Sequence, residues 1–468
     1  MLGSRMLGRP IFIASFLGCL VLSTATVSAQ KRLSEQAAET LLQSGDRLAD
    51  QGDYLEAVRN YTEAYLGIVA KLRQQEFSKD VTPSLMTREE LAEEMKRQVK
   101  EEYTDAEWKL IQGTYRAFGL IPNTIDVKET MTKLLTEEVG GFYDPKTKAM
   151  VLVREADKKR QPGTLGRLLG QKPTFDKEEQ KITLAHELTH ALQDQLYGLL
   201  DKQRSIEHDD DMSMAFSALV EGDATLIMFG EMGRQEGDST TWTQMDPDAA
   251  KLMFNMMKMM LPVAAGKTYR AAPAIFRDSL LFPYSQGFVF NLNLTRKGGI
   301  DRIHQAYATP PVSTEQILHP KKYLEDRDDP ITITITSPEN LLDSQWKHLG
   351  GNCLGEFQIS ILFRRTPNGT QASEGWDGDR YEIYEDRDGN LALIWCSIWD
   401  SADDAKQFET AWNRYAELRE IQDKTTIERN ESRVRVVQGI SQEIARSVLE
   451  KLRCVESPKV FPASKPNP

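Results

Sequence analysis

Cysteine is scarce in this chain, with four among 468 residues. One lies near the N-terminus, and the others are Cys353, Cys396 and Cys454. Their spacing matches no zinc knuckle, and three cysteines in an oxidising compartment allow at most one internal disulfide and a free thiol. Free cysteine often behaves as a small apolar side chain, so we expect these residues to be buried rather than to form a disulfide framework.

Long apolar runs are rare after the first thirty residues. The most apolar later stretch, 252–266, is interrupted by Asn255, Lys258 and Pro262, which does not suit a transmembrane helix. We expect its Met-rich part, 252–260, to pack in the core rather than to line a substrate groove. No stable membrane span is therefore expected once the N-terminal segment is removed.

An excess of positive charge is also absent. The chain has 58 Lys and Arg against 70 Asp and Glu, a net charge of −12. Removal of residues 1–29 deletes two arginines and no acid, which leaves 56 against 70, or −14. Such an acidic protein has no electrostatic attraction to nucleic acid or to anionic lipid, so we expect no nucleic-acid partner.

The N-terminal segment is typical of a secretory signal peptide. Arg5 and Arg9 precede an apolar run over 11–21, and the small residues of 27–29 resemble a cleavage site. We predict that residues 1–29 are a signal peptide and that the protein is secreted or periplasmic. An uncleaved membrane anchor is the alternative, because the apolar stretch approaches spanning length.

Residues 30–115 are predicted to form a helical N-terminal region. Two helices over 33–77 include GDYLEAVRNYTEAY (52–65), which resembles one tetratricopeptide (TPR) repeat. Such repeats need neighbours to bury their faces, and no second copy is present. We expect a helical hairpin docked onto the next domain, and a surface for a protein partner is the alternative. A polar connection over 78–90 and one charged helix over 88–115 follow.

Residues 331–455 are predicted to form a C-terminal α+β module, with a disordered Pro-rich tail over 456–468. Ser401 and Asp404 have capping-box spacing and start a helix. A strand and a second helix follow that helix. Strand-like patterns cover 331–336, 356–365, 380–386 and 390–399.

The intervening region, 116–330, contains the stretch KITLAHELTHALQDQLYGL. Leucines recur in it every four residues and predict the buried side of a helix. On that helix His186 and His190 share one face, so both can bind one ion with Glu187 beside it. Two imidazoles leave Zn²⁺ needing one more protein ligand and a water, and the glutamate can act as general base. Because so short a motif also arises by chance, a third ligand is required.

Glu221 is the preferred third ligand. It lies in the apolar helical pattern FSALVEGDATLIMFGEM (216–232), where a carboxylate is costly unless it is paired or binds metal. Glu207 and Asp209 to Asp211 are nearer, but they belong to the charge run SIEHDDD. We expect that run to be a solvated loop or an incidental cation site.

HELTHALQD followed by ALVEGDAT resembles the gluzincin zinc metallopeptidases, the clan that includes thermolysin. The resemblance implies a gluzincin-like α+β metallopeptidase domain over 116–330. It also implies Zn²⁺ bound by His186, His190 and Glu221, with Glu187 as the general base.

The resemblance has one departure close to the site. In thermolysin an aspartate four residues after the glutamate ligand orients a histidine, whereas Thr225 stands at that position here. Asp223 and Asp194 are the alternatives for this role. The stretch between His190 and Glu221 is also longer than in thermolysin, which implies an insertion near 198–212.

The resemblance extends, over about 120–330, to uncharacterised exported bacterial proteins of this clan. GFYDPKTKAMVLV (141–153) is similar to their edge strand, which aligns the substrate backbone, and we assign that role to 148–153 within a predicted hairpin. LFPYSQGFVF and PPVSTEQILHPKKY are similar to downstream landmarks. An acyl-transfer site also needs a donor to the oxyanion, and Tyr284 and His319, which stand among proline or turn residues, are the preferred candidates, with Tyr323 as a further one. The alternative for each is a side chain hydrogen-bonded inside the fold.

The sequence thus predicts an exported zinc-dependent peptidase that acts on a peptide or protein. In this hypothesis a zinc-bound water attacks the peptide carbonyl and Glu187 takes the proton. The main alternative is a catalytically degenerate zinc-containing scaffold of the cell envelope, against which the intact Glu187 counts. A third alternative is a zinc hydrolase that acts on another substrate class.

Overall fold

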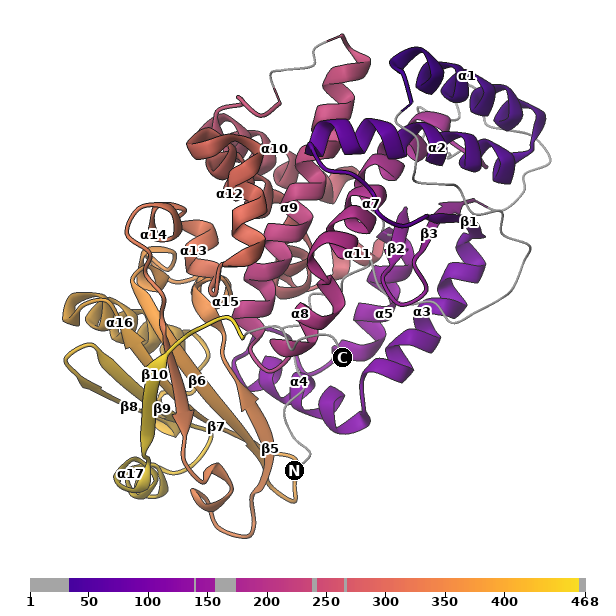
Figure 1. Cartoon of the computed structure of the whole chain (residues 1–468). Helices are drawn as coiled ribbons and strands as arrows, with labels where there is room; N and C mark the ends of the chain where they lie inside the picture. The colour runs from indigo at the N-terminus through magenta and orange to yellow at the C-terminus, as the bar shows by residue number, and fades with distance from the viewer. Residues whose placement is uncertain (1–32, 139, 156–173, 238–241, 265–266, 463–468) are drawn as a thin grey trace, which may run out of the picture.

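The computed structural model describes residues 33–138, 140–155, 174–237, 242–264 and 267–462. Over these residues the chain is an α+β protein, with helices in the centre and at the N-terminal side and a twisted sheet at the C-terminal side (Figure 1). The signal peptide predicted over 1–29 lies outside the described residues.

The N-terminal hairpin consists of α1 (Glu35–Gln51) and α2 (Tyr54–Arg73). Ser34 caps α1 by accepting a hydrogen bond from the backbone N–H of Ala37, and Gly52, at φ 86°, makes the left-handed turn into α2. In the structure α2 packs against α7 (Lys177–Tyr197), so the hairpin is docked onto the region that follows it.

The predicted polar connection contains a strand. β1 (Thr82–Thr87) pairs in parallel with β3 (Ala149–Arg154), and Thr87 then caps the next helix through a capping box. The prediction of a plain connection was wrong because β1 finds its partner in a segment far along the chain.

The charged stretch over 88–115 forms two helices, not one. They are α3 (Arg88–Glu102) and α4 (Asp105–Ala117), and Thr104 starts the second through its own capping box. α3 packs against β1 and β3, whereas α4 packs against the C-terminal sheet. The predicted region 30–115 therefore contacts two different sheets.

The hairpin predicted over 139–153 is present as β2 (Gly141–Asp144) and β3. The sheet order is β1-β3-β2. Both sides of β3 are therefore paired, and the assignment of 148–153 as the edge strand was wrong. Within the described residues, β2 is the edge strand on the side away from β1.

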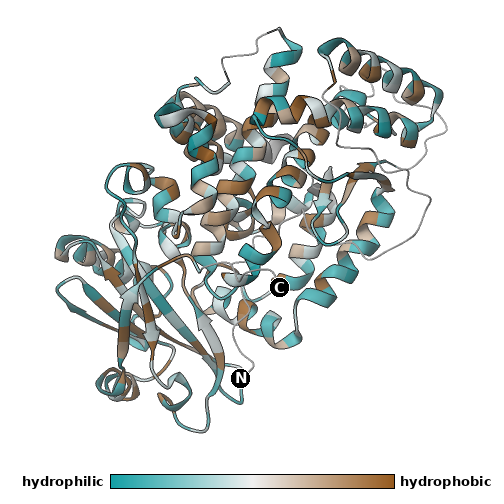
Figure 2. Cartoon of the chain, viewed as in Figure 1, coloured by the Kyte–Doolittle hydropathy of each residue, from teal (hydrophilic) through white to brown (hydrophobic). Residues whose placement is uncertain are grey.

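The central region is a group of packed helices. Its bounds are α5 (Val127–Glu138), α7 (Lys177–Tyr197), α8 (Leu199–Ser205), α9 (Asp210–Gln235), α10 (Pro247–Ala264), α11 (Lys267–Ala271), α12 (Ala274–Ala308), α13 (Thr314–Leu318) and α14 (Lys321–Leu324). α12 is broken at Gly298 and Gly299, where the backbone leaves the helical region. α7, α9 and α12 pack side by side at the centre, where apolar residues alternate with polar ones along the ribbon (Figure 2).

Among the described residues, α9 is the helix that is long and apolar enough to cross a bilayer. In its most apolar stretch 89% of the residues are buried inside the protein, as in the core helix of a globular domain. α9 is covered on one side by α7 and on another by α12.

The Met-rich helix α10 does not pack as expected. Phe254 is buried, but Leu252, Met256, Met259 and Met260 are more than half exposed, with Met259 at 73%. The prediction that 252–260 is core was wrong, because α10 lies on α12 through one face and the described part of its other face has no covering element.

The C-terminal module contains a sheet in the order β5-β6-β7-β9-β8. The prediction of a strand over 356–365 was wrong, since this apolar stretch forms α15 and packs against α13 and β6. Ser401 caps its helix by accepting from the N–H of Asp404, as its spacing predicts. The bounds are β4 (Ile331–Ile335), β5 (Lys347–Asn352), α15 (Gly355–Leu362), β6 (Trp376–Glu385), β7 (Leu391–Trp399), α16 (Ala402–Leu418), β8 (Thr425–Asn430), β9 (Arg433–Gln438), α17 (Gln442–Lys451) and β10 (Cys454–Pro458).

The predicted disordered tail begins as a strand. β10 pairs antiparallel with β4, and Lys459 directly after it is buried. The prediction was wrong for 456–459, because these residues have partners in β4 and in α9. Residues 463–468 lie outside the described part of the chain.

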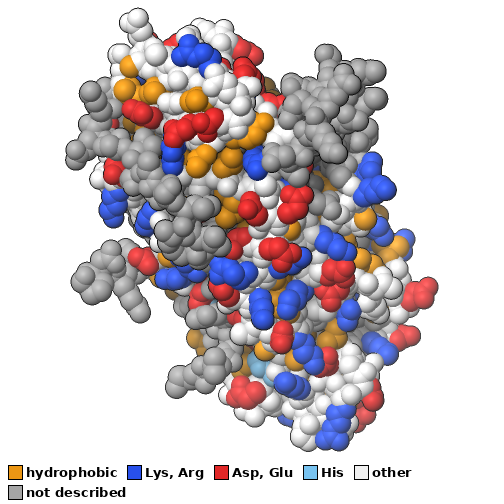
Figure 3. Space-filling model, turned by 90° about the vertical axis from the view of Figure 1, so that its right-hand side faces the viewer, with side chains coloured by type: hydrophobic (Ala, Val, Ile, Leu, Met, Phe, Trp, Pro, Cys, Tyr) orange, Lys and Arg blue, Asp and Glu red, His pale blue; other side chains and the backbone are white. Residues whose placement is uncertain are grey.

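One continuous apolar core joins the hairpin, the central helices and one face of the C-terminal sheet. A second, smaller core fills the other face of that sheet beneath β4 and α17. On the outside, in the view of Figure 3, Lys and Arg side chains are interspersed with Asp and Glu. That face therefore has no large patch of a single charge, although the net charge of the chain is negative.

Candidate metal centre

The motif helix α7 carries both histidines on one face. Asp176 caps it by accepting from the N–H of Glu179, and Gly198, at φ 63°, ends it in the left-handed region. His186 and His190 lie one turn apart, and their Nε2 atoms are 3.1 Å from each other. Both side chains are buried.

Helix α9 brings Glu221 to the same point. Its Oε2 lies 3.1 Å from Nε2 of His186 and 3.3 Å from Nε2 of His190. The three ligand atoms lie within 4.8 Å of one another, and all three residues are buried. The residues predicted as metal ligands are thus brought together, and the group is able to hold a metal ion.

A glycine pair sets the distance between α9 and α12. A Cβ on Gly222 would collide with the backbone of Gly287, and a Cβ on Gly287 would collide with the backbone of Ala218. Asn291 on α12 also bonds to α9, since its Nδ2 donates to the carbonyl of Leu219 at 3.1 Å. Gly222 follows Glu221 directly, so this close approach holds the carboxylate in place.

The charges in the group oppose the effect of burial. Burial alone would raise the pKa of Glu221, but the charge of His190 and hydrogen bonds from both histidines hold it at about 2. Burial alone would lower the pKa of His190, but the Glu221 carboxylate raises it to about 9. Without metal, the site is therefore held together by an imidazolium–carboxylate pair.

Glu187 lies beside the group without being part of it. Burial raises the pKa of Glu187, while the charges of His186 and His190 and a hydrogen bond from the backbone N–H of Tyr143 oppose that rise. Its Oε2 is buried and has no hydrogen-bond partner among the described residues. Tyr143 belongs to β2, so the edge strand reaches the candidate base directly.

The other nitrogen of His190 has its own partner. Nδ1 lies 2.9 Å from Oε1 of Gln193, whose Nε2 donates to Oδ2 of Asp223 at 2.8 Å. The same Asp223 oxygen accepts from the hydroxyl of Tyr307 at 2.9 Å and lies 3.1 Å from a guanidinium nitrogen of the fully buried Arg73. Such outer contacts fix the ring orientation of a metal-binding histidine.

This chain of contacts decides between the two aspartates. Asp223 supports His190 through Gln193, whereas Asp194 accepts from the Tyr143 hydroxyl at 3.0 Å and pairs with Lys148 at 2.7 Å. Gln193 was missed in the sequence, although it stands one turn after His190. The part that Arg73 plays in this network could not be recognised from the sequence, because Arg73 belongs to α2 of the distant hairpin.

Tyr284 lies at the site. It is partly buried on α12, and its ring stacks on that of His186 at 5.9 Å between centroids. Burial, the charges of Glu221 and Glu187 and a hydrogen bond to Glu221 raise the pKa of Tyr284 well above its ordinary value. Its hydroxyl therefore keeps its proton.

His319 and Tyr323 are engaged elsewhere. Nε2 of His319 lies 2.8 Å from Oε1 of Glu356, and the Tyr323 hydroxyl donates to the carbonyl of Thr309 at 2.8 Å. Neither has a described contact with the metal-binding group. The geometry favours Tyr284 over both as the oxyanion donor.

The SIEHDDD run is not a solvated loop. Asp210 and Asp211 are buried at the start of α9, and Asp209 caps that helix. Asp210 pairs with Asn352, and Asp211 accepts from Thr314 and Lys459. These contacts serve the packing of α9, and none of the three aspartates joins the metal-binding group.

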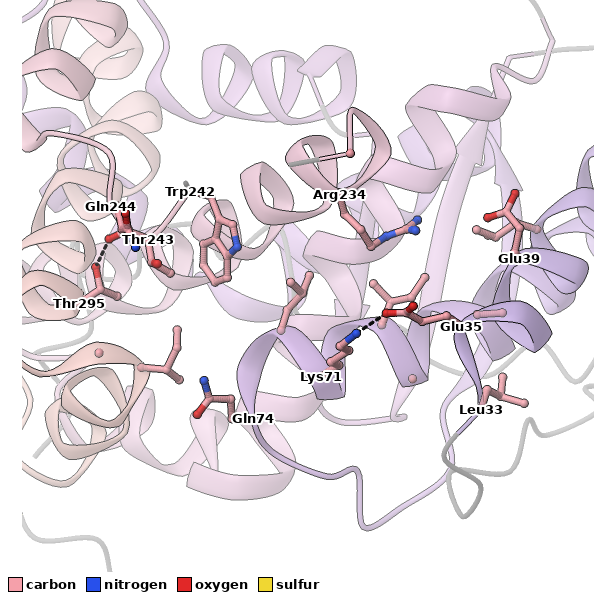
Figure 4. A pocket seen from close by; sticks show the side chains of 18 of the residues that line it. Leu33, Glu35, Glu39, Lys71, Gln74, Arg234, Trp242, Thr243, Gln244 and Thr295 are labelled. Atoms are coloured by element: carbon pink, nitrogen blue, oxygen red, sulfur yellow. Dashed lines mark hydrogen bonds and ion pairs between the residues drawn. The ribbon is translucent and has the colours of Figure 1, made fainter. Parts of the chain in front are cut away.

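A cavity lies away from this centre, and none of the three candidate ligands lines it. It measures about 1250 Å³ and is bounded by the hairpin, by the C-terminal end of α9, by residues 242–244 and by α12 around its break at Gly299 (Figure 4). Among its charged side chains, Lys71 is bonded to Glu35, Arg234 to Glu231 and Arg296 to Asp246. No metal-ligating group lines it among the described residues.

Comparisons with known proteins reach only the C-terminal module. Residues 345–449 match the family Domain of unknown function (DUF8575), which leaves α7 and α9 outside the match. No curated protein and no solved structure matches the chain.

Proposed function

We propose that this protein is an exported zinc-dependent peptidase of the gluzincin type. The observation that carries the proposal is the convergence of His186, His190 and Glu221 in one buried group, with Glu187 beside it. The 1–29 pattern supports export.

The residues fit a zinc ion. Two imidazole nitrogens and one carboxylate oxygen are a donor set that catalytic zinc sites use, with a fourth position left for water or substrate. Zn²⁺ bound there would act as a Lewis acid on a carbonyl and lower the pKa of a water to about 7. The same donor set also accepts other first-row metals, so zinc itself belongs to the proposal.

Side chains of the protein would supply the general base, the oxyanion donor and the support of the ligand ring. Glu187 would take a proton at Oε2, which has no other partner among the described residues, and pass it to the leaving amine. The Tyr284 hydroxyl would donate to the developing oxyanion, because its raised pKa keeps the proton in place. Gln193 and Asp223 would hold the His190 ring in orientation.

The edge strand β2 gives a place for substrate. Its backbone lies against Glu187 through Tyr143, and on the side away from β3 it has no paired strand among the described residues. An extended peptide that adds to this edge would pass the candidate base, so strand addition would align the scissile bond.

The test begins with metal content. Purified protein should hold one zinc per chain by elemental mass spectrometry, and Glu221→Ala should lose most of it. Glu231→Gln is the matched control, since Glu231 is a buried acid on the same helix that pairs with Arg234 instead. Equal metal content in wild type and Glu221→Ala would contradict the ligand assignment.

Glu187→Gln then separates enzyme from scaffold. On a mixture of peptides followed by mass spectrometry, this variant should keep its zinc and lose turnover by a factor of about 10² or more. Glu178→Gln, an exposed acid on the same helix, is the control and should cleave like wild type. Wild-type protein that binds zinc and cleaves no peptide would favour the scaffold alternative.

A further inference from the structure

Two of the cysteines meet between the sheet and the C-terminal strand. Cys396 lies on β7 in the middle of the five-strand order and is 3% exposed. Cys454 is the first residue of β10, which pairs with β4 and with no strand of that larger sheet. The two residues are 58 positions apart, so a bond between them would close a long loop.

Their sulfur atoms are closer than a packing contact needs. Sγ of Cys396 lies 2.9 Å from Sγ of Cys454, within about 1 Å of the ~2.05 Å length of a disulfide bond. Cys353 is different, because its Sγ donates to Oδ1 of Asp209 at 3.1 Å and has no second thiol beside it among the described residues. One pair and one isolated thiol are thus defined by geometry.

The pair also has the features that thiol–disulfide exchange needs. Cys454 is partly exposed, and its pKa is lowered by the Cys396 thiol and by the Arg435 guanidinium, so the reachable member is the better nucleophile. Arg435 lies opposite Cys396 in the register of β7 and β9, and its charge acts on both sulfurs. The buried Cys396 is then placed to attack second.

We propose that Cys396 and Cys454 are a disulfide site, and that the bond staples the C-terminal strand to the central strand of the sheet. The oxidant is a disulfide donor of the thiol-exchange class. This replaces the expectation that the cysteines serve only as small buried residues, and it does not depend on the proposed peptidase activity.

Formation of the disulfide takes two thiol–disulfide exchange steps. The Cys454 thiolate attacks one sulfur of the donor R–S–S–R and releases R–S⁻, which leaves a mixed disulfide on Cys454. Cys396 loses its proton to solvent, and its thiolate attacks Sγ of Cys454 and releases the second R–S⁻. Two protein thiols are oxidised, and one donor disulfide is reduced to two thiols.

The staple would hold more than the strand. Directly after β10, Nζ of Lys459 lies 3.0 Å from Asp209 and 3.1 Å from Asp211, and its side chain is 3% exposed. Both aspartates stand at the start of α9, the helix that carries Glu221. The bond would therefore keep a buried ion pair closed at the base of the metal-binding helix.

The experiment uses the full chain in mixtures of oxidised and reduced glutathione. We expect the oxidised protein to have two thiols fewer than the reduced protein, and a peptide map to contain one cross-linked pair with Cys396 and Cys454. Cys353→Ser should form the same cross-link, whereas Cys454→Ser should not. Full oxidation without this cross-link, or a cross-link through Cys353, would overturn the proposal.

Trypsin tests the staple separately, because Lys459 is a cleavage site that is buried while the tail is docked. Cleavage after Lys459 should be faster by about tenfold or more in the reduced wild type than in the oxidised one, while Cys454→Ser should be fast in both buffers. Equal rates in oxidised and reduced wild type would show that the bond does not hold the tail. If Cys454→Ser fails to fold, the peptide map and cleavage rates of wild type still decide.

Discussion

Helices α9 and α10 are both apolar in sequence, yet they have opposite positions in the molecule. α9 holds Asp211, Glu221, Asp223 and Glu231 in the interior, each with a partner on another side chain. α10 exposes Met259 and its neighbours instead. Apolar composition therefore does not decide burial, because α9 is enclosed by α7 and α12 whereas α10 packs through one face only, on α12 and on Phe229 of α9.

Removing a buried charge from α9 should destabilise the protein most. Asp223→Ala leaves Arg73 buried without its carboxylate, and breaking such a pair costs about 3–5 kcal/mol of unfolding free energy. Zinc affinity should also fall by about 10–100-fold, because Gln193 loses its anchor.

Urea unfolding and metal competition measure the two effects. Arg296→Ala is the control, since its pair with Asp246 is about half exposed and such pairs contribute about 0–1 kcal/mol. If both variants unfold alike, the buried pair does not stabilise the fold.

The next effect concerns the contact between α9 and α12. Gly222→Ala forces a methyl group into the backbone of Gly287, and we expect a loss of about 3 kcal/mol with weaker zinc binding. Gly67→Ala on α2 is the matched control, because its nearest neighbour lies 3.8 Å from the added carbon. Thermal unfolding that is equal for the two variants would refute the close approach.

The charged group on α7 and α9 should respond to pH. The pKa of His190 is raised from 6.5 to about 9 and that of Glu221 is lowered from 4.5 to about 2, so this pair stabilises the metal-free fold fully between about pH 4.5 and 6.5. The stabilisation falls progressively as pH rises to about 9 or drops to about 2. As pH rises from about 6.5 to about 9, zinc affinity should increase, because metal and proton compete for the imidazole.

Calorimetry of zinc binding in buffers of different ionisation enthalpy would report the released proton. In Glu221→Gln the carboxylate charge is gone, and the proton release between about pH 6.5 and 9 should shrink. Proton release that is unchanged in this variant would show that another group is titrating.

The smallest expected effect lies on α10. Met259→Ala should change the unfolding free energy by about 0.5 kcal/mol or less, because its side chain is 73% exposed. Phe254→Ala on the same helix should cost about 3–5 kcal/mol, since Phe254 is buried against Phe229 and Phe288. Equal losses for the two variants would mean that the exposed face is covered in solution.

Much of the candidate site could be predicted from the sequence. The spacing of His186 and His190 places both on one helical face, and the isolated Glu221 marks a second buried helix. Both predictions depend on local periodicity, which the structure retains. The support for His190 was less accessible, since Gln193 is local but Arg73 belongs to another element.

The fold was predictable to a smaller extent. The hairpin β2–β3 and the capped helix α16 were found because turn and cap residues act on their own neighbours. β1 and α15 were missed because the partner that selects their conformation lies elsewhere in the chain. His319 was expected at the site because it stands among proline and turn residues, whereas its contact is with Glu356.

The sequence by itself determined which residues could bind a metal and which helices carry them, because helix geometry relates side chains three and four positions apart. Only the packed chain shows that α9 is enclosed while one face of α10 is exposed, that β3 lies between β1 and β2, and that Cys396 meets Cys454. These outcomes depend on contacts between distant segments, whose free energy belongs to the packed chain and to no single stretch of it.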